Sequence, residues 1–360
     1  MQQQSMIDEL HTLMNFFPVS HNQQAVGALL DHVEARLHQC GLIVERIEHG
    51  GFNSLYASTR GQKHARVMLQ GHIDVVPGGE VFRREDDKLY GRGCYDMLFA
   101  TASFLRLVDD LENPASYDIS ILLTGDEEIG GTNGVGAVLD IDTYACDVCI
   151  LPDAGEGLGT MSIAAKGIFD LRVRANGTSH HGSRPWEGDN AADKLVGFLG
   201  TLKTLFDMSD NDNSTCIISQ LEAGNEALNQ GPAEAIAGID IRYTDQKEYD
   251  RIRSELERLA KAYDVEILYE QIGRSFSLDT DAPIVKRFID IYKEEVGEPI
   301  ELMKAHGSSD ARYFDSKNIP VIMYRPDGGN AHGDGEWLSI SSWQTFHKIL
   351  ERYVVEEAKA

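Results

Sequence analysis

The chain of 360 residues is too long for one comfortable hydrophobic core, so its length predicts two domains. Its composition, with 42% hydrophobic and 25% charged residues, is ordinary for a soluble globular protein. A formal net charge of −25 argues against nucleic acid and anionic membrane surfaces as partners, because both would repel the protein.

Targeting and redox features of the sequence favour the cytoplasm. The first residues, MQQQSMIDEL, show neither the basic n-region nor the apolar h-region of a secretory signal. No stretch approaches the roughly 18 apolar residues that a membrane span requires. The five cysteines lack the spacing of a disulfide framework, which fits a reducing compartment. Cys146 and Cys149 form a CxxC pair within an apolar run, and we interpret them as small buried strand residues rather than a redox or zinc pair.

The first part of the chain alternates between helical and strand-like patterns. A helix is predicted over residues 23–39, because apolar side chains recur there at helical spacing and Gly41 follows as a stop. Strands are predicted over residues 65–70, 119–124 and 146–151, and a second helix over residues 99–111. Continuous apolar strands separated by helices are typical of a largely parallel sheet that is covered on both faces.

The pattern changes near residue 166. Residues 167–175 alternate with period two, as a half-solvated strand does. Further elements are predicted in chain order: a helix at 190–206, strands at 216–224 and 235–243, a helix at 246–262, and a strand at 265–269. This order, β-α-β-β-α-β, is that of a ferredoxin-like fold.

The chain returns to α/β character from about residue 276, with a helix at 282–296, a strand at 319–324 and a terminal helix. We therefore predict an α/β protein in which one domain, with a mixed and mostly parallel sheet, spans residues 1–165 and 276–360. A smaller ferredoxin-like α+β domain is inserted at residues 166–275.

Side chains that suit metal ions follow the apolar strands, at the sheet edge where ligands bind in open α/β folds. His72 and Asp74 come directly after the run ARVMLQG, and residues two apart on extended chain point to the same side. Asp74 can therefore accept one imidazole N–H while the other nitrogen of His72 binds a metal. An HxD pair alone is weak evidence, and its position at a strand end strengthens it.

Glu127 and Glu128 follow the run ISILLTGD and precede two glycines. Neighbouring residues point in different directions, so one carboxylate can bind a metal while the other serves as a general base. Elsewhere, a run of acids such as Asp126–Glu128 would be a solvated surface loop. Here it closes a buried strand, which favours a site.

Three further residues complete the constellation. Asp96 follows the turn GRG and precedes an apolar helix, so a role as the helix N-cap explains it equally well. Asp153 follows the strand at 146–151, with Glu156 as a near alternative. His332 lies in the glycine-rich loop GGNAHGDGEW, where a histidine alone would be an ordinary surface residue. Together with the histidine and glutamates above, they predict a binuclear zinc site and its catalytic base.

Seven segments, in order from residue 71 to residue 337, resemble the zinc-dependent aminoacylase/carboxypeptidase family. They are GHIDVVPG, GRGCYDM, DEEIGG, the KG at 166–167, SHHGSRPWEGDNA, SSDARYF and AHGDGEW. Each segment alone is modest, whereas seven in order are highly specific and cover nearly the whole chain. The family includes acetylornithine deacetylase, succinyl-diaminopimelate desuccinylase and related dipeptidases.

The resemblance implies a catalytic domain with an inserted lid that dimerises, and two zinc ions per chain. His72 and Asp153 would bind one ion, Glu128 and His332 the other, and Asp96 would bridge the two. Cobalt or manganese could substitute, because mixed histidine and carboxylate ligands accept several ions.

The resemblance also implies the catalytic roles. Glu127 would be the general base, and Asp74 would orient His72. The family has a lid histidine that reaches into the partner subunit's site and stabilises the oxyanion, and it matches His181. His180 is the alternative, because the double histidine leaves an ambiguity of one residue.

Substrate contacts are implied for Asn229 and Arg242, which lie in the stretch 224–243, and for Arg312 in SSDARYF. A guanidinium offers a bidentate fork to a carboxylate, which suits the two arginines. A salt bridge with Asp240 or another acid of the lid explains Arg242 equally well.

The sequence departs from the family pattern at two places. Position 153 is Asp, where deacylases and carboxypeptidases of the family more often have Glu, and Asp is more typical of relatives that cut dipeptides or free N-termini. Leu98 and Phe99 stand in place of the usual Lys-Gly, at the floor of the expected pocket. Neither departure removes a ligand.

We therefore expect a cytoplasmic binuclear zinc hydrolase that cleaves the amide bond of a small N-acyl amino acid and dimerises through the inserted domain. A dipeptidase or aminopeptidase with the same metals is the alternative that Asp153 favours. A catalytically silent dimer that only binds a metabolite is a third reading, and the complete set of ligands argues against it.

Overall fold

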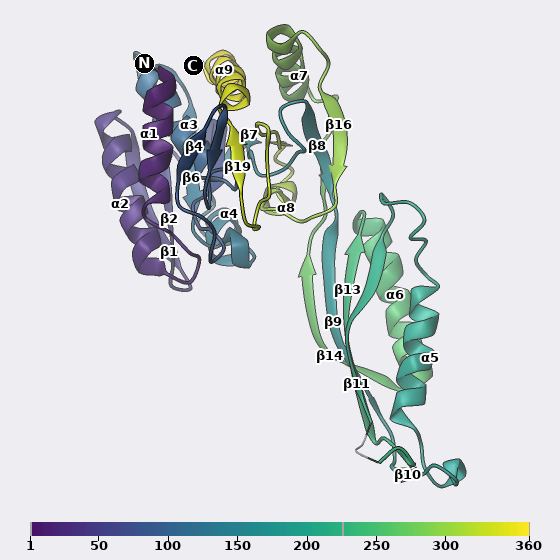
Figure 1. Ribbon diagram of the computed structural model, residues 1–360. Helices are drawn as coiled ribbons and strands as arrows, with labels where there is room; N and C mark the ends of the chain where they lie inside the picture. Colours follow the sequence, from purple (N-terminus) through teal and green to yellow (C-terminus); the bar gives the residue numbers. More distant parts are fainter. Residues whose placement is uncertain (1, 225–226, 360) are drawn as a thin grey trace. The chain divides into compact units, whose positions relative to one another are not determined.

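The computed structural model describes residues 2–224 and 227–359, which form two compact units (Figure 1). The first unit comprises the chain up to Ile163, together with Ser277–Ala305 and the residues from Ser309 onward. The second comprises Ala164–Phe276 and His306–Ser308. Among the described residues, no helix combines the length and apolar character needed to cross a bilayer.

A mixed sheet forms the centre of the first unit. Its strands lie in the order β1 (Ile43–His49), β2 (Phe52–Ser58), β6 (Ile119–Thr124), β3 (His64–His72), β7 (Ala145–Ile150) and β17 (Val321–Ile322). The strands β6, β3, β7 and β17 pair in parallel, whereas β1–β2 and β2–β6 are antiparallel. The predicted mixed, mostly parallel sheet is confirmed.

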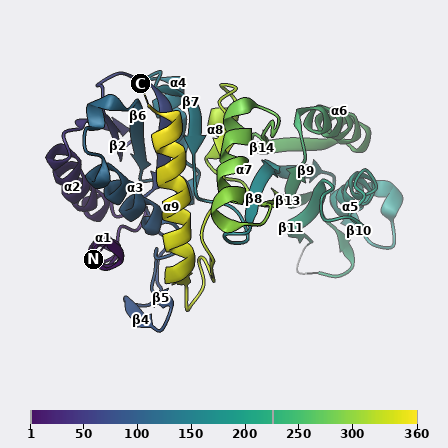
Figure 2. The ribbon, with the colours of Figure 1, turned by 90° about the horizontal axis from the view of Figure 1, so that it is seen from above.

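Helices pack around this sheet. They are α1 (Gln2–Met14), α2 (Gln23–Gln39), α3 (Leu98–Asp110), α4 (Ala137–Asp140), α7 (Pro283–Val296), α8 (Ala311–Asp315) and α9 (Ile340–Glu357). The predicted helix 23–39 is confirmed, and its apolar stripe is buried from Val26 to Leu37. Helices α7 and α9 lie side by side (Figure 2), where the rings of Phe288 and Tyr353 meet edge to face at 5.5 Å.

Two small sheets belong to elements that the sequence patterns did not predict. An antiparallel sheet has the order β18 (Gly328–Gly329), β19 (Trp337–Ser339), β5 (Lys88–Tyr90) and β4 (Arg83–Glu85). A second sheet has the order β15 (Phe276–Ser277), β8 (Thr160–Ala165) and β16 (Glu301–Ala305). The pairing of β19 with β5 sets Trp337 opposite Tyr90, so it joins two segments far apart in the sequence.

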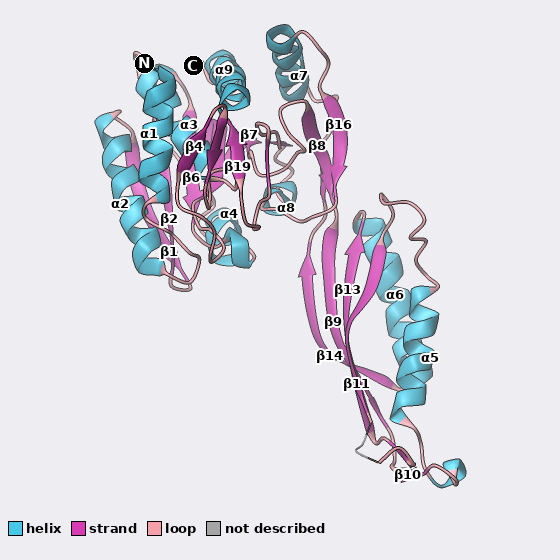
Figure 3. Cartoon of the chain, viewed as in Figure 1, coloured by secondary structure: helices cyan, strands magenta, loops and turns pink. Residues whose placement is uncertain are grey.

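The second unit has the predicted ferredoxin-like order. Its elements are β9 (Gly167–Asn176), α5 (Ala191–Lys203), β11 (Thr215–Ala223), β13 (Glu234–Tyr243), α6 (Gln246–Tyr263) and β14 (Val265–Gly273). The sheet is antiparallel with the order β11-β13-β9-β14, and α5 and α6 lie together on one of its faces (Figure 3). A short ribbon pairs β10 (His180–His181) with β12 (Gln230–Gly231). Residues 225 and 226 of the predicted stretch 224–243 lie outside the described residues.

Some predicted boundaries differ from the structure. The predicted strand 319–324 is reduced to Val321–Ile322, because β17 pairs only with β7 at the sheet edge. The interpretation of Cys146 and Cys149 as buried strand residues is confirmed, since both are free cysteines buried on β7. Burial raises the pKa of both thiols, which makes them poor nucleophiles and poor metal ligands.

The core of the second unit yields a stability prediction. Phe198 of α5 is fully buried against the sheet, whereas Val196 on the same helix is 61% exposed. We expect Phe198→Ala to lower the free energy of unfolding by about 3–5 kcal/mol, because it removes a large buried ring. Val196→Ala should change it by less than about 0.5 kcal/mol. Urea unfolding followed by circular dichroism measures both, and equal effects would contradict the burial of Phe198.

Candidate metal centre

Three parallel strands of the central sheet end at one edge, and the candidate site begins there. His72 is the last residue of β3, while Glu127 and Glu128 follow β6 in a short 3₁₀ turn. Asp153 follows β7. Because β6, β3 and β7 are parallel neighbours, their carboxyl ends meet, and the side chains that follow them converge.

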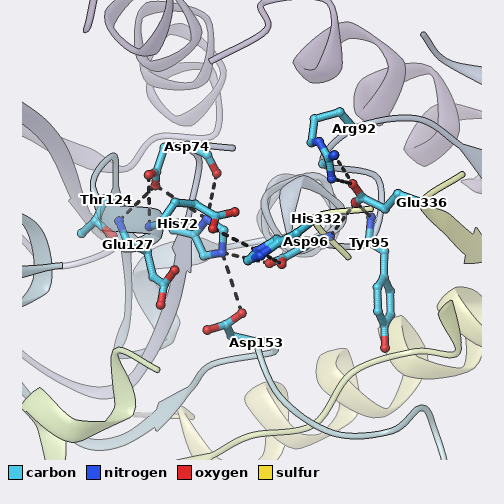
Figure 4. A network of polar contacts seen from close by, with 12 residues as sticks. His72, Asp74, Arg92, Tyr95, Asp96, Thr124, Glu127, Asp153, His332 and Glu336 are labelled. Atoms are coloured by element: carbon cyan, nitrogen blue, oxygen red, sulfur yellow. Dashed lines mark hydrogen bonds and ion pairs between the residues drawn. The ribbon is translucent and has the colours of Figure 1, made fainter. Parts of the chain in front are cut away.

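His72 is buried and faces acidic oxygens on both sides of its ring. Its Nδ1 lies 2.9 Å from the backbone oxygen of Asp74 and 3.6 Å from the Asp74 carboxylate, so the carbonyl is the nearer acceptor. Its Nε2 lies 3.1 Å from Oδ1 of Asp96 and 3.7 Å from Oδ1 of Asp153 (Figure 4). Burial alone would lower the pKa of His72, but hydrogen bonds to Asp153 and Asp96 raise it well above its usual value.

Asp96 lies between the two histidines of the site. Its Oδ1 faces His72, and its Oδ2 lies 3.0 Å from Nε2 of His332. Burial opposes ionisation of Asp96, but the hydrogen bonds from His332 and His72 outweigh it and lower the pKa. The peptide bond that follows Asp96 is cis. Asp96 makes no side-chain cap of α3, so the alternative role as an N-cap is not realised.

Glu128 completes a chain of contacts with His332. Its Oε2 lies 2.9 Å from Nε2 of His332, and its side chain is only 5% exposed. Burial raises the pKa of Glu128 to about 7. A proton therefore competes with any cation for this carboxylate near neutral pH.

Glu127 differs from its neighbour. Within the described part of the chain its carboxylate has no hydrogen-bond partner, and in Figure 4 it points away from Asp74 toward the side where Asp153 lies. Burial, together with the charge of Asp153, raises the pKa of Glu127 well above its usual value. A half-buried carboxylate without a hydrogen-bond partner, beside the donors described above, is placed to take up a proton as a general base does.

The Asp74 carboxylate holds the loop that carries both glutamates. It accepts the backbone N–H of Glu127 at 3.2 Å and that of Glu128 at 3.3 Å. The side chain is fully buried, which raises the pKa of Asp74. Asp74 therefore contributes to the site in two ways, through its carbonyl to His72 and through its carboxylate to the glutamate loop.

The donor set fits divalent cations. One donor atom each from His72, Asp96 and Glu128 lie within 4.8 Å of one another, and His332 contacts two of these residues. When Nδ1 of His72 donates its hydrogen to the Asp74 carbonyl, Nε2 of a neutral ring carries a lone pair. That lone pair faces carboxylate oxygens, and the contact is favourable only if a proton or a cation lies between them. Mixed imidazole and carboxylate donors suit zinc and several other divalent ions.

Several residues named from the sequence lie apart from these contacts. Glu156 is exposed, whereas the side chain of Asp153 is only 10% exposed, so the structure favours Asp153. The Arg312 guanidinium donates to the backbone oxygen of Ser309 at 3.3 Å. Its other terminal nitrogen donates to the backbone oxygen of Gly130. Arg312 is thereby held close to the loop that follows the glutamates.

The remaining named residues belong to the second unit. His180 packs its ring against Gly188 and Gly231, where any Cβ would collide with it. His181 is exposed, with its Nδ1 2.8 Å from the Ser183 hydroxyl and its Nε2 3.3 Å from the amide nitrogen of Asn229. Of the two histidines, His181 is the more exposed, whereas His180 is half-buried.

Arg242 forms a salt bridge with Asp240, the alternative to substrate binding that the sequence suggested. Its Nε and one terminal nitrogen each lie 2.8 Å from an oxygen of Asp240. The hydrogen bonds to Asp240 raise the pKa of Arg242.

Sequence reasoning missed two buried acids near the site, Glu336 and Asp310. Glu336 is 2% exposed and accepts hydrogen bonds from the loop that carries Asp96. Asp310 is fully buried beside Gly131, and its carboxylate accepts no hydrogen bond from any described residue. Burial raises the pKa of Asp310 to about 7. A signal for Glu336 was available, since it directly precedes the apolar pair Trp337-Leu338 in a segment already singled out.

Comparison with known proteins identifies the family. Residues 68–356 match peptidase family M20/M25/M40. The chain belongs to this family. The predicted resemblance is thereby confirmed, and with it the chain is placed among metal-dependent hydrolases that use divalent ions.

Individual relatives agree with this placement. The chain is 28% identical over 350 residues to a succinyl-diaminopimelate desuccinylase of Novosphingobium aromaticivorans, covering 91% of this chain and 92% of that one. A succinyl-diaminopimelate desuccinylase of Dinoroseobacter shibae is 29% identical over 352 residues, with 91% and 93% covered.

Solved structures share the fold. A tripeptidase from Staphylococcus aureus superposes with a TM-score of 0.81 at 18% identity, covering 99% of both chains. An aminopeptidase PepT from Bacillus cereus gives the same TM-score at 16% identity, with 99% and 98% covered. At such low identity these structures establish the fold and leave the substrate open.

The two histidines of β3 provide a test of the metal centre. His72, at the end of the strand, faces Asp96, whereas His64, at its start, has a side chain that is 58% exposed. We expect His72→Ala to weaken zinc or manganese binding by at least about 100-fold, since it removes a direct donor. Titration calorimetry of the metal-stripped protein measures this. His64→Ala should bind like the wild type, and equal losses in both variants would refute the site.

Proposed function

We propose that the protein is a binuclear metal-dependent amidohydrolase that removes the acyl group from a small N-acyl amino acid. The observation that carries this proposal is the linked set of His72, Asp96, His332 and Glu128. A half-buried Glu127 lies beside this set and binds none of its members. Such a set offers donors for cations and a separate carboxylate for proton transfer. Hydrolysis of an amide bond needs both.

The side chains divide the work as follows. His72 and Asp153 would hold one zinc ion, Glu128 and His332 a second, and Asp96 would lie between them. When bound, the ions would polarise the scissile carbonyl and acidify the attacking water. Cobalt or manganese could serve in place of zinc.

Glu127 would perform the proton transfers. Its raised pKa and lack of a partner suit a group that takes a proton from the attacking water and returns it to the leaving amine. Asp74 would keep Glu127 in place through the backbone N–H of that residue.

The alternative is a peptidase that acts on short peptides with a free N-terminus. Asp153 at a position where deacylases more often have Glu supports it. The similarity to two succinyl-diaminopimelate desuccinylases, at 28% and 29% identity over almost the whole chain, supports the deacylase. A dimer that only binds a metabolite is disfavoured, because the proposed donors and the proposed base lie close together.

A substrate panel separates these activities. Purified protein with added zinc would be assayed on N-succinyl-diaminopimelate, N-acetyl-ornithine, and a set of free dipeptides and tripeptides. Hydrolysis of the acyl compounds at a kcat/KM at least ten times that of the peptides would support the deacylase. The reverse ranking would replace it with the peptidase, and no hydrolysis of any compound would favour the silent dimer.

The base assignment makes a second prediction. We expect Glu127→Gln to keep metal binding but to lose about 100-fold to 10,000-fold in kcat, because the amide cannot take up a proton. Glu156→Gln is the matched control, since Glu156 is an exposed acid that follows the neighbouring strand. Steady-state rates, with metal content measured on the same samples, provide the readout. A Glu127→Gln variant with the wild-type rate would exclude this base.

We further propose that the second unit is a lid through which the protein forms a homodimer. Its edge strand β11 exposes the apolar residues Ile217 and Leu221, and an exposed apolar edge is suited to pairing with another chain. In such a dimer His181 would act on the partner's substrate as an oxyanion donor. Asn229, which lies beside His181, and the arginines Arg242 and Arg312 would contribute to substrate binding.

The oxyanion role predicts an asymmetric kinetic effect. We expect His181→Ala to lower kcat by about 100-fold or more while KM changes little, because the contact would form mainly in the transition state. His180→Ala should instead lower the melting temperature, since the ring of His180 packs against two glycines. A His181→Ala effect confined to KM would contradict the oxyanion role.

A further inference from the structure

Glu336 is a buried carboxylate that neither the ligand set nor the proton transfers include. Its side chain is 1% exposed, and both of its oxygens are used. Oε1 accepts the backbone N–H of Tyr95 at 2.9 Å and that of Asp96 at 3.0 Å. Oε2 accepts the backbone N–H of Gly93 at 3.1 Å and the Arg92 guanidinium at 2.8 Å (Figure 4).

The main chain of Glu336 holds the same loop. Its carbonyl accepts the backbone N–H of Gly91 at 3.1 Å, which continues the ladder between β5 and β19. The Arg92 guanidinium also donates to the backbone oxygen of Gly333 at 3.2 Å. The segment 91–96 is therefore fastened along its length to the segment 333–336.

These contacts link two parts of the metal centre. Asp96 has to present its two oxygens to two different imidazoles, which requires a fixed backbone at that residue. Glu336 fixes that backbone through the N–H of Asp96 itself, and it stands four residues after His332, which meets the second oxygen. One carboxylate thus sets the spacing between the loop of Asp96 and the loop of His332.

A purely structural reading would treat Glu336 as the partner that neutralises Arg92 in the core. That reading explains the contact at Oε2 with the guanidinium. It leaves Oε1 unexplained, because that oxygen binds only the backbone N–H groups of Tyr95 and Asp96. Shortening the side chain while keeping its charge can separate the two roles.

We propose that Glu336 is a positioning residue for Asp96, through which the bridging carboxylate and His332 are held at the separation that a pair of divalent cations needs. This inference rests on the proposed function, since it assumes that Asp96 bridges cations. Partners that orient metal ligands typically contribute 10-fold to 100-fold in metal affinity.

The test compares Glu336→Asp and Glu336→Gln with the wild type. Aspartate keeps the negative charge that pairs with Arg92 but is shorter by one methylene. It therefore cannot accept hydrogen bonds from Arg92 and from the backbone of Tyr95 and Asp96 at the same time. Glutamine keeps the length of the side chain but replaces one carboxylate oxygen by an NH₂ group. That group would face N–H donors instead of accepting hydrogen bonds from them. For both variants we expect zinc or manganese binding by the metal-stripped protein to weaken by about 10-fold to 100-fold. We also expect faster hydrogen exchange of the amides in residues 93–96 without metal.

Asp87→Asn is the matched control. The Asp87 carboxylate lies on the turn between β4 and β5 of the same small sheet and accepts hydrogen bonds from Ser339 and Ser341. These hydrogen bonds lead to the start of α9 and not to the loop of Asp96. We expect Asp87→Asn to lower the melting temperature while metal affinity and exchange in residues 93–96 stay at wild-type values.

The outcomes separate the positioning role from the proposed function. Wild-type protein that binds no divalent cation would refute the proposed function, and exchange in residues 93–96 would still show whether Glu336 holds Asp96. Wild-type metal affinity and exchange in Glu336→Asp would overturn the positioning role alone. If Glu336→Gln fails to fold while Glu336→Asp folds and binds metal normally, Glu336 serves only to neutralise Arg92, and the proposal is also refuted.

Discussion

The arrangement of the site depends on bringing several largely buried carboxylates together beside one exposed histidine, His332. Burial raises the pKa of Asp74, Glu127 and Glu128, because an isolated charge is costly in a poorly polar environment. Asp96 is the exception, and its pKa is lowered because two imidazoles contact it. Like charges can remain at this density only if positive charge is supplied, by protonated histidines or by cations. The condition that makes the cluster costly is therefore the one that a bound cation would relieve.

Two different scaffolds supply the groups that meet there. The parallel strands β3, β6 and β7 deliver His72, the glutamates and Asp153 at their common edge. The small antiparallel sheet delivers Asp96 and His332 from segments more than two hundred residues apart, and the register of β5 with β19 brings these segments together. The first scaffold is a general property of open α/β sheets. In the second, the buried carboxylate of Glu336 accepts backbone N–H groups from the loop of Asp96.

This difference explains how much could be predicted from the sequence. Continuous apolar runs predicted the strands β3, β6 and β7. Because ligands of open α/β sheets bind where the strands end, the residues that follow these runs became the candidates: His72, Glu127, Glu128 and Asp153. Short strands such as β19, Trp337–Ser339, are too brief to show a period, so the contacts of Glu336 could not be inferred from pattern alone.

Two local features also escaped prediction. Helix α1 begins with glutamines and shows its buried positions, such as Leu10 and Leu13, only once it is packed. For Asp74, the alternation of extended chain suggested a carboxylate facing the imidazole of His72. In the structure the nearer acceptor is its carbonyl, because the carboxylate is engaged by the backbone of the glutamate loop.

That engagement bears on how neighbouring glutamates can take different roles. The two oxygens of Asp74 hold the backbone N–H groups of Glu127 and Glu128 side by side, so neither residue can rotate its backbone to follow the other. With the amides fixed in a 3₁₀ turn, the two side chains must leave in different directions. One reaches His332, and the other remains beside Asp153 without a partner. The separation between a ligand-like and a base-like carboxylate thus follows from one buried acid in the preceding loop, before any cation is considered.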